Sequence, residues 1–399
     1  MLVFDKFYSE RKLRYGKCKN CDRYNTSLDW CETCGLWTSG NTNIDNCIKR
    51  YEDIIEWVPF HRLDGIKIIG KGGFGKVFSA TWLDGRRNYT SQRASLIVAL
   101  KTLPGSQNNF LREFENYMKF RSVCIELEVY GLTRNLKKEY LMVFQYANVG
   151  NLRNYLTSHF KELNWKSKLK LLMEISEDLA KIHKVSYVHV DFHSGNILLC
   201  QSLDGGIIPY IADLGLSRKK EESDSEGIYG VLPYVAPEVL NKEMYTSAAD
   251  IYSFGVIMAE LSTGKPPHYD MDYNEELAIK ICNGLRPEFS KDIPECYIQL
   301  ANQCMDNNPS NRSIASDVNN KLNFLYMIVR SKYAKMFENG PVIKEAFEYA
   351  NRIIPTLPTN IPNYSQSKLT SKLLNFQNLS NLLNSSFILH AQSSRIFGK

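Results

Sequence analysis

A glycine-rich turn between two strand-like runs is the feature that most constrains how this chain can fold. Residues 69–77, IGKGGFGKV, place glycines at 70, 72 and 75 in a G-x-G-x-x-G pattern. Such glycines let the backbone approach a phosphate closely, although the same pattern also opens dinucleotide-binding βαβ units or forms a plain turn. A dinucleotide site needs a helix at the third glycine. Here the alternating, β-branched run KVFSATW follows, and it predicts a second strand.

From about Phe60 to Val329 the pattern changes from short β-like runs to long helical ones. Strands are expected at IKIIG, KVFSATW, SLIVALK and EYLMVFQYA, and helices at FLREFENYMKF, KSKLKLLMEISEDLAKIH and AADIYSFGVIMAELST. This order predicts an α+β domain over residues 60–330, with a β-rich lobe before an α-rich lobe.

Two charged residues in the β-rich part suit phosphate binding. Lys101 closes the apolar run VALK, where a lysine often only reaches out to the surface. A helix is expected next, and its Glu113 could hold the Lys101 ammonium against the α- and β-phosphates of a nucleotide. Glu115 competes for this role, and the helix periodicity does not decide between them.

Two further motifs supply oxygen ligands and a carboxylate for phosphoryl transfer. In HVDFHSGN, residues 189–196, Asp191 and Asn196 stand five positions apart, which lets the aspartate orient or deprotonate a hydroxyl while the asparagine reaches Mg²⁺. In IADLG, Asp213 follows an apolar strand, and its carboxylate suits the Mg²⁺ that bridges the β- and γ-phosphates. Each motif alone could be a turn or a capped strand end, but their order and spacing favour phosphoryl transfer.

In this order the motifs resemble the eukaryotic protein kinase family. YVAPE, DIYSFGVIMAEL with Asp250, and CMDNNPSNR are further matches, and in the family the arginine matched by Arg312 pairs with the glutamate matched by Glu238. The resemblance implies a bilobal kinase fold, ATP and Mg²⁺ (or Mn²⁺) as cofactors, and protein substrates in intracellular signalling. PYVAPE resembles the tyrosine-kinase-like and Ser/Thr groups, so Ser/Thr acceptors are expected, with Tyr specificity left open. Several segments, GKCKNCDRYNTSLDWCETC among them, also resemble an expanded group of such kinases in arbuscular mycorrhizal fungi.

The resemblance also implies two sets of site residues. The gatekeeper is Phe144, and Gln145 to Ala147 form the hinge that binds adenine. The full nucleotide-binding set is Ile69, Gly70, Gly72, Gly75, Val77, Ala99, Lys101, Phe144, Gln145, Tyr146, Ala147 and Leu198. The catalytic set is Lys101, Glu113, Asp191, His193, Asn196 and Asp213, of which Asn196 and Asp213 bind Mg²⁺.

The chain departs from the family's pattern beside the catalytic aspartate. Val190 stands where most kinases carry an arginine that grips a phosphate on the activation loop, so control is expected to depend less on phosphorylation of that loop. Val231 replaces the threonine that usually follows the glycine before it, which leaves the pattern for the acceptor residue incomplete. Leu214 replaces a phenylalanine, an apolar change expected to be tolerated.

His193 stands where these enzymes usually have a lysine that touches the transferring phosphoryl group. An imidazole titrates near pH 6.5 in general, so it can donate a hydrogen bond without a full charge. If this role holds, His193→Lys should flatten the pH dependence of turnover between about 6 and 7.5. The alternative is that His193 is merely tolerated.

Four cysteines in two C-x-x-C pairs mark the N-terminal segment, residues 1–58. Cys18, Cys21, Cys31 and Cys34 match a closed tetrahedral Zn²⁺ site, with a redox role as the alternative. The segment is distantly similar to the Ran-binding-protein type of zinc finger, whose members bind ubiquitin or RNA. Its spacing is one residue short and the usual tryptophan is absent, so that function is not transferred, and an adaptor or ubiquitin-like partner stays open. A linker helix is expected at IDNCIKRYEDIIEWV.

Residues 331–399 are expected to hold a helix at AFEYANRII and a mostly disordered tail. The alternative for the tail is a docking helix, because apolar residues recur at steps of three and four from Leu369 to Phe387. The net charge of +6 is too small to predict nucleic-acid binding. The sequence shows no signal peptide and no apolar run that would cross a bilayer, so a cytoplasmic or nuclear protein is expected.

A scaffold that lacks phosphotransfer activity is the alternative function. Such a pseudokinase would recruit partners through the zinc segment and the tail. Because a scaffold has no chemical need for the five polar residues Lys101, Glu113, Asp191, Asn196 and Asp213, the sequence favours an enzyme.

Overall fold

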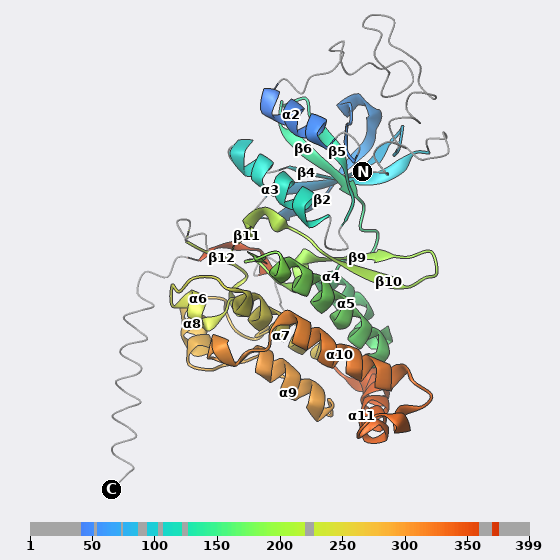
Figure 1. Ribbon diagram of the computed structural model, residues 1–399, viewed down its shortest axis with the longest axis vertical. Coiled ribbons are helices and arrows are strands. Elements are labelled where there is room, and N and C mark those ends of the chain that lie inside the picture. Colours follow the sequence, from blue (N-terminus) through green and yellow to red (C-terminus); the bar gives the residue numbers. More distant parts are fainter. Residues whose placement is uncertain are drawn as a thin grey trace, which may run out of the picture. The chain divides into compact units, whose positions relative to one another are not determined.

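The computed structural model describes residues 41–51, 54–72, 75–86, 94–102, 107–121, 127–219, 227–358 and 369–374. These residues fold into two compact units (Figure 1). The first unit takes its described residues from Met1–Lys71, Gly75–Leu111 and Glu128–Tyr146. The second takes them from Gly72–Phe74, Arg112–Leu127 and Ala147–Lys399.

The first unit is built on a six-stranded sheet of order β1-β5-β6-β4-β3-β2. Its strands are β1 (Glu56–Trp57), β2 (Leu63–Gly72), β3 (Gly75–Trp82), β4 (Leu96–Thr102), β5 (Val129–Arg134) and β6 (Tyr140–Gln145). The pairs β3–β4, β4–β6 and β5–β6 are antiparallel, whereas β1 is parallel to β5.

Alternation along the strands buries one face of this sheet. On β4, Val98 and Leu100 are fully buried while Ile97 between them is 55% exposed, as a period of two requires. Trp82 and Val143 join the same core cluster. These contacts fix the register of β4, and with it the face on which each residue of VALK lies.

Helix α2 (Thr42–Arg50) belongs to the same unit and buries the apolar residues of one of its faces. The Asn41 side chain accepts hydrogen bonds from the backbone N–H groups of Asn43 and Ile44, which caps the helix. Ile44, Cys47 and Ile48 are buried at helical spacing. The helix expected over residues 44–58 therefore ends at Arg50, and β1 follows it.

The second unit is mainly helical, and α3 (Gln107–Phe120) contributes residues to both units. Its other helices are α4 (Leu152–His159), α5 (Trp165–Lys184), α6 (Pro237–Leu240), α7 (Ser247–Thr263), α8 (Glu275–Cys282), α9 (Glu295–Cys304), α10 (Ala315–Arg330) and α11 (Gly340–Ile353). Every residue of α7 from Ala249 to Ser262 is buried, so α7 is the central helix. Helix α10 packs along α5, and α9 packs against α7.

The second unit also contains seven short strands among its described residues. They are β7 (Gly150–Asn151), β8 (Tyr187–Val188), β9 (Ile197–Gln201), β10 (Ile207–Ile211), β11 (Arg218–Lys219), β12 (Ile228–Gly230) and β13 (Lys372–Leu374). β10, β9 and β7 form one sheet, and β11–β8 and β12–β13 form two-stranded pairs. The tail segment expected to be disordered or helical thus contains a strand, β13, paired with β12 (Figure 1).

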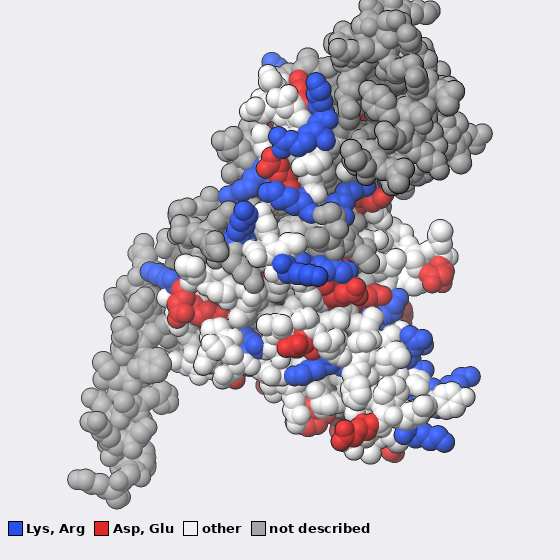
Figure 2. Space-filling model, viewed as in Figure 1, with Lys and Arg blue, Asp and Glu red and all other residues white. Residues whose placement is uncertain are grey.

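The structure confirms the α+β class and the order of a β-rich and then an α-rich part. Each of the four expected strands and three expected long helices is present, and α11 contains the expected AFEYANRII. Within the described residues no helix is long and apolar enough to cross a membrane. Basic and acidic side chains are interspersed on the face drawn in Figure 2.

Candidate active site

The loop His189–Asn196 connects β8 to the strand β9 and carries three of the expected catalytic residues, Asp191, His193 and Asn196. Asp191 is only 3% exposed. The Asn196 Nδ2 donates hydrogen bonds to the backbone oxygen of Asp191 at 2.9 Å and to its Oδ2 at 3.1 Å. Because the amide nitrogen faces Asp191, Oδ1 is the side-chain atom of Asn196 left to bind a cation.

The carboxylate of Asp250, on α7, holds the start of this loop. Its Oδ2 accepts from the backbone N–H of His189 at 2.8 Å, and its Oδ1 accepts from that of Val190 at 3.1 Å. The His183 Nε2 on α5 lies 2.8 Å from the same Oδ2. Val190 has a φ of +77°, a strained conformation for a β-branched residue. These hydrogen bonds from a buried helix offset that strain.

His193 is fixed by contacts to both of its ring nitrogens. Nδ1 accepts from the backbone N–H of Gly195 at 3.0 Å and from Arg153 Nη2 at 3.3 Å. Because Nδ1 acts as the acceptor of both bonds, the ring proton belongs on Nε2. Nε2 lies 2.9 Å from the Ser371 hydroxyl and 3.5 Å from Asp191 Oδ1.

A glycine at position 195 makes this arrangement of His193 possible. A Cβ on Gly195 would lie 2.9 Å from two atoms of the imidazole and 3.1 Å from Arg153 Nη1. The loop therefore brings Asp191 and His193 together beside Ser371, which lies 178 positions after His193 in the chain.

The surroundings of Asp191 keep its carboxylate ionised. Burial raises the pKa of Asp191, but the His193 imidazole and then the Ser371 hydroxyl stabilise the carboxylate more strongly, and the pKa falls to about 2. At neutral pH this carboxylate therefore carries a full negative charge.

The segment after β10 carries Asp213 in a left-handed conformation, with φ +64° and ψ +60°. Its backbone N–H donates to Tyr117 Oη on α3 at 3.1 Å. The backbone N–H of Ala212 donates to the backbone oxygen of Asn196 at 2.8 Å. This hydrogen bond places Asp213 next to the loop His189–Asn196. The structure thus brings the two expected Mg²⁺ ligands, Asn196 and Asp213, onto adjacent segments.

Helix α3 holds the segment after Asp213 in place. The Asn116 Nδ2 donates to the backbone oxygens of Leu214 and Ser217 at 3.1 and 3.0 Å. Glu113 is 2% exposed, and its Oε2 would lie 2.7 Å from a Cβ added to Gly215. Glu113 thus faces this segment, whereas Glu115 is half-buried.

The expected nucleotide-binding residues fall into two groups. In the first unit, Lys101 lies opposite Val77 on β3 and Met142 on β6, and Ala99 lies opposite Phe144. Lys101 is 9% exposed. Ile69 is 49% exposed, and the nearest atom to a Cβ added at Gly70 would be the Val77 Cβ at 3.7 Å.

Gly75, Gln145 and Tyr146 also belong to the first unit, whereas Ala147 and Leu198 belong to the second. Ala147 and Leu198 pack there against a cluster formed by Leu127, Cys200 and Tyr210. Ala147 and Leu198, two of the expected nucleotide-binding residues, thus pack against the same apolar cluster.

The expected pairing of Glu238 with Arg312 is confirmed. Arg312 Nη1 and Nη2 donate to Oε1 and Oε2 of Glu238 at 2.7 and 2.8 Å, and both side chains are buried. Arg312 also donates to the backbone oxygens of Asp306 and Ala248. The pair joins α6, the turn before α10, and the start of α7.

Residues 63–322 match the family model described as protein tyrosine and serine/threonine kinase. The chain belongs to this family. It is 29% identical over 279 residues to the probable serine/threonine-protein kinase pats1 and 28% identical over 345 residues to the probable serine/threonine-protein kinase roco6, both of Dictyostelium discoideum. It is 28% identical over 272 residues to the brassinosteroid LRR receptor kinase BRI1 of Oryza sativa subsp. japonica.

These three matches cover 66%, 81% and 61% of this chain but only 8%, 15% and 23% of the relatives. The chain therefore spans a small part of the length of each relative. What it shares with them is a protein kinase domain of the bilobal α+β fold, which implies ATP and Mg²⁺ as ligands.

Four residues around the loop His189–Asn196 were not singled out from the sequence, although Tyr234 and Glu260 lie within the motifs YVAPE and DIYSFGVIMAEL. Ser194 Oγ lies 3.1 Å from Tyr234 Oη, which donates to the buried Glu260 at 2.7 Å. Burial raises the pKa of Glu260, and Arg153 and the Tyr234 hydroxyl partly offset this. Arg153 and Ser371 contact His193 as described above. Only the tertiary fold brings Arg153, Tyr234, Glu260 and Ser371 to the loop.

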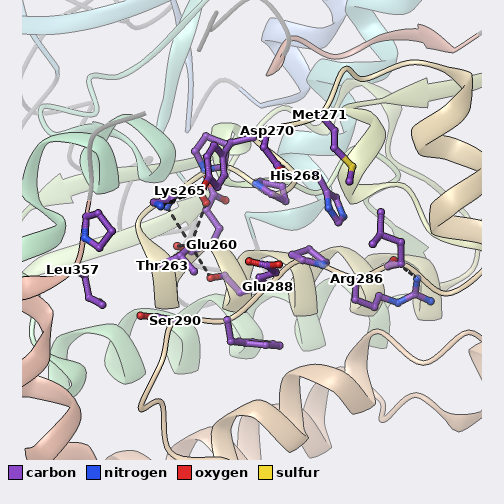
Figure 3. Close-up of a pocket in the computed structure, with 18 of the residues that line it drawn as sticks. Glu260, Thr263, Lys265, His268, Asp270, Met271, Arg286, Glu288, Ser290 and Leu357 are labelled. Atoms are coloured by element: carbon purple, nitrogen blue, oxygen red, sulfur yellow. Dashed lines mark hydrogen bonds between the residues drawn. The ribbon is translucent and has the colours of Figure 1, made fainter. Parts of the chain in front are cut away.

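A cavity of about 470 Å³ lies elsewhere in the second unit of the kinase domain (Figure 3). Glu260, Lys265, His268 and Arg286 line it. Burial lowers the pKa of His268 to about 4, so its imidazole is neutral at physiological pH. None of the expected catalytic residues lines this cavity.

The expected zinc ligands Cys18, Cys21, Cys31 and Cys34 lie outside the described residues, as do the activation-loop serines Ser223 and Ser225. Within the described part of the chain no cluster of three or more His, Cys, Asp or Glu side chains could hold a metal. The Mg²⁺ ligand pair of one carboxylate and one amide, with phosphate oxygens from ATP, needs no such cluster.

Proposed function

We propose that this chain is an active kinase that transfers the γ-phosphate of ATP to Ser or Thr hydroxyls of protein substrates in intracellular signalling. The observation that carries the proposal is the geometry of Asp191. Its buried, ionised carboxylate is oriented by Asn196, on a loop whose backbone is held by Asp250. A scaffold has no need of an ionised carboxylate buried in this way.

Asp191 serves mainly to orient the acceptor hydroxyl. A carboxylate with a pKa of about 2 is a weak base, so it takes the hydroxyl proton only as the new phosphorus–oxygen bond forms. His193 Nε2–H lies beside it and can donate a hydrogen bond at the same place. Asp213 and Asn196 Oδ1 would hold Mg²⁺, which supplies positive charge to the phosphates.

The nucleotide is assigned to the glycine-rich turn and the sheet. Gly70, Gly72 and Gly75 would cover the phosphates, and Lys101 would pair with them, with Glu113 as its partner. Val77, Ala99 and Leu198 would form the apolar walls of the adenine site. Phe144 would be its gatekeeper, and Gln145, Tyr146 and Ala147 would form the hinge that binds adenine. Ile69 completes the nucleotide-binding set.

The test is incubation of the purified chain with labelled ATP, Mg²⁺ and generic Ser/Thr substrates, beside Lys101→Met and Asp213→Asn. Transfer to Ser or Thr that disappears in both variants is the expected result. ATP binding without transfer by the unmodified chain would favour the scaffold function.

The N-terminal segment, residues 1–58, is proposed to be a structural zinc unit that precedes the kinase domain of residues 60–330 in the chain. The expected result is one Zn²⁺ per chain by elemental analysis, lost on Cys18→Ser with Cys31→Ser. Full zinc content in that double variant would contradict the assignment.

A further inference from the structure

The C-terminal strand β13 lies against the loop that precedes α6. β13 pairs antiparallel with β12, with Lys372 opposite Gly230, Leu373 opposite Tyr229 and Leu374 opposite Ile228. In Figure 1 the short red strand lies beside β12. A segment near the end of the chain thus adds to the edge of a loop close to Asp191, since a Cβ on Gly230 would lie 3.5 Å from Asp191 Oδ1.

Contacts on both sides of Ser371 fix its position. Leu369 is 3% exposed, and its carbonyl accepts from Arg153 Nη1 at 2.8 Å. Leu374 is 6% exposed, whereas Leu373 is 51% exposed. The segment is therefore anchored by Leu369 before Ser371 and by Leu374 after it.

The hydroxyl of Ser371 is oriented by His193, in the loop His189–Asn196. His193 Nδ1 accepts two hydrogen bonds, so Nε2–H is the donor to the Ser371 oxygen at 2.9 Å. This leaves the hydroxyl hydrogen of Ser371 to be donated elsewhere. The neighbouring buried acceptor is Asp191 Oδ1, which has no hydrogen-bond partner among the described residues and lies 3.5 Å from the same Nε2.

We propose that Ser371 is an intramolecular phosphoacceptor of this kinase. The proposal rests on the function assigned above, because it places the Ser371 hydroxyl where a substrate hydroxyl is oriented by Asp191. Thr370 precedes it but is not held in this way by any contact that the structure shows. The segment Leu369–Leu374 thus occupies the acceptor site as a substrate does.

The chemical step is a simple displacement. The Ser371 Oγ forms a bond to the γ-phosphorus of ATP, the bond from that phosphorus to the β–γ bridging oxygen breaks, and ADP leaves with the electron pair. The hydroxyl proton passes to Asp191 as the new bond forms. No co-reactant other than the nucleoside triphosphate is needed.

Tethering has a kinetic consequence. A linked segment has an effective concentration on the order of millimolar. Transfer to Ser371 should therefore be first order, with a rate per molecule independent of protein concentration, and the segment should compete with added peptides.

The experiment follows phosphate on Ser371 by mass spectrometry in the purified full chain with ATP and Mg²⁺, with a generic Ser/Thr peptide in the same reaction. Four variants are compared: Ser371→Ala, Thr370→Ala, Leu374→Asp and Leu373→Asp. The last two place the same charge at a buried and at an exposed position of one strand.

The expected result is phosphate on Ser371 at a rate that does not change over a wide range of protein concentration. Thr370→Ala and Leu373→Asp should retain it, Ser371→Ala should abolish it, and Leu374→Asp should slow it at least about tenfold because the hydroxyl is no longer positioned. Peptide phosphorylation should persist in Thr370→Ala, Leu373→Asp and Leu374→Asp.

Two results would overturn the proposal while leaving the proposed function intact. One is peptide phosphorylation with no phosphate on Ser371, which would make the segment a blocking element only. The other is a rate per molecule that rises in proportion to protein concentration, which would show transfer between molecules. If neither the peptide nor Ser371 is labelled, the proposed function itself fails, and this proposal with it.

Discussion

Arg312 and Glu238 meet through two parallel hydrogen bonds of 2.7 and 2.8 Å, and both side chains are buried. Removing one partner of such a pair leaves a buried charge uncompensated, which typically costs about 3–5 kcal/mol. We expect Arg312→Leu to lower the free energy of unfolding by about this amount in urea titrations. Arg312→Lys keeps the charge but cannot make two parallel hydrogen bonds. Its free energy of unfolding should lie between those of Arg312→Leu and the unmodified chain. Equal stability of Arg312→Leu and the unmodified chain would contradict this.

Val190 should be replaceable with a gain in stability. A β-branched residue at φ +77° is strained, and asparagine tolerates this region much better. We expect Val190→Asn to raise the free energy of unfolding by about 1 kcal/mol. Val190→Ala keeps a Cβ and should gain less, which makes it the control. A decrease with Asn, measured by thermal unfolding, would show that packing of the Val190 side chain outweighs the strain.

Lys168 should make stability depend on pH. Its amine is fully buried, lies 4.0 Å from the centre of the Phe160 ring and has no hydrogen-bond partner among the described residues. Burial lowers the pKa of Lys168 from 10.5 to about 7. Between these values the unfolded chain binds the proton and the folded chain releases it, so stability rises with pH, by up to about 1.4 kcal/mol per unit.

The test for Lys168 compares melting temperatures at pH 7 and pH 9 in the unmodified chain and in Lys168→Met. The variant removes the titrating group and should reduce the rise between the two pH values. It should also be the more stable protein at pH 7, where the amine of the unmodified chain is still partly charged. An identical pH response in both proteins would exclude this role for Lys168.

Glu113 and Glu115 offer a matched pair for the assignment of the carboxylate on α3. Glu113 is buried against Gly215, whereas Glu115 is half-buried. We expect Glu113→Gln to lower kcat/KM by about tenfold or more, and Glu115→Gln to change it by less than about twofold. Circular dichroism should show both folded. The reverse order of effects would transfer the role to Glu115.

Elements with a strong local pattern were predictable from the sequence. The alternation of VALK and the helical spacing of KSKLKLLMEISEDLAKIH are set by burial within a single element, and both elements are present as expected. The loop geometry followed from the spacing of Asp191 and Asn196, because a five-residue turn brings their side chains together.

The conformation of residues 369–374 was not predictable, because it depends on a distant partner. The apolar positions of Leu369 and Leu373 have helical spacing, yet β12 offers hydrogen bonds that select a strand, and the side chain buried is Leu374 rather than Leu373. Arg153 and Ser371 likewise reach His193 across 40 and 178 positions of the chain. No local pattern marks such contacts.

Within the loop, Asp250 accepts hydrogen bonds from the main-chain N–H groups of His189 and Val190, which do not involve the side chain at position 190. These hydrogen bonds hold the backbone of the loop whichever side chain stands at position 190. The arginine that binds activation-loop phosphate in most kinases can therefore be absent at position 190 while Asp191 keeps its position. The expected loss of control through activation-loop phosphate would therefore leave in place the hydrogen bonds that position Asp191.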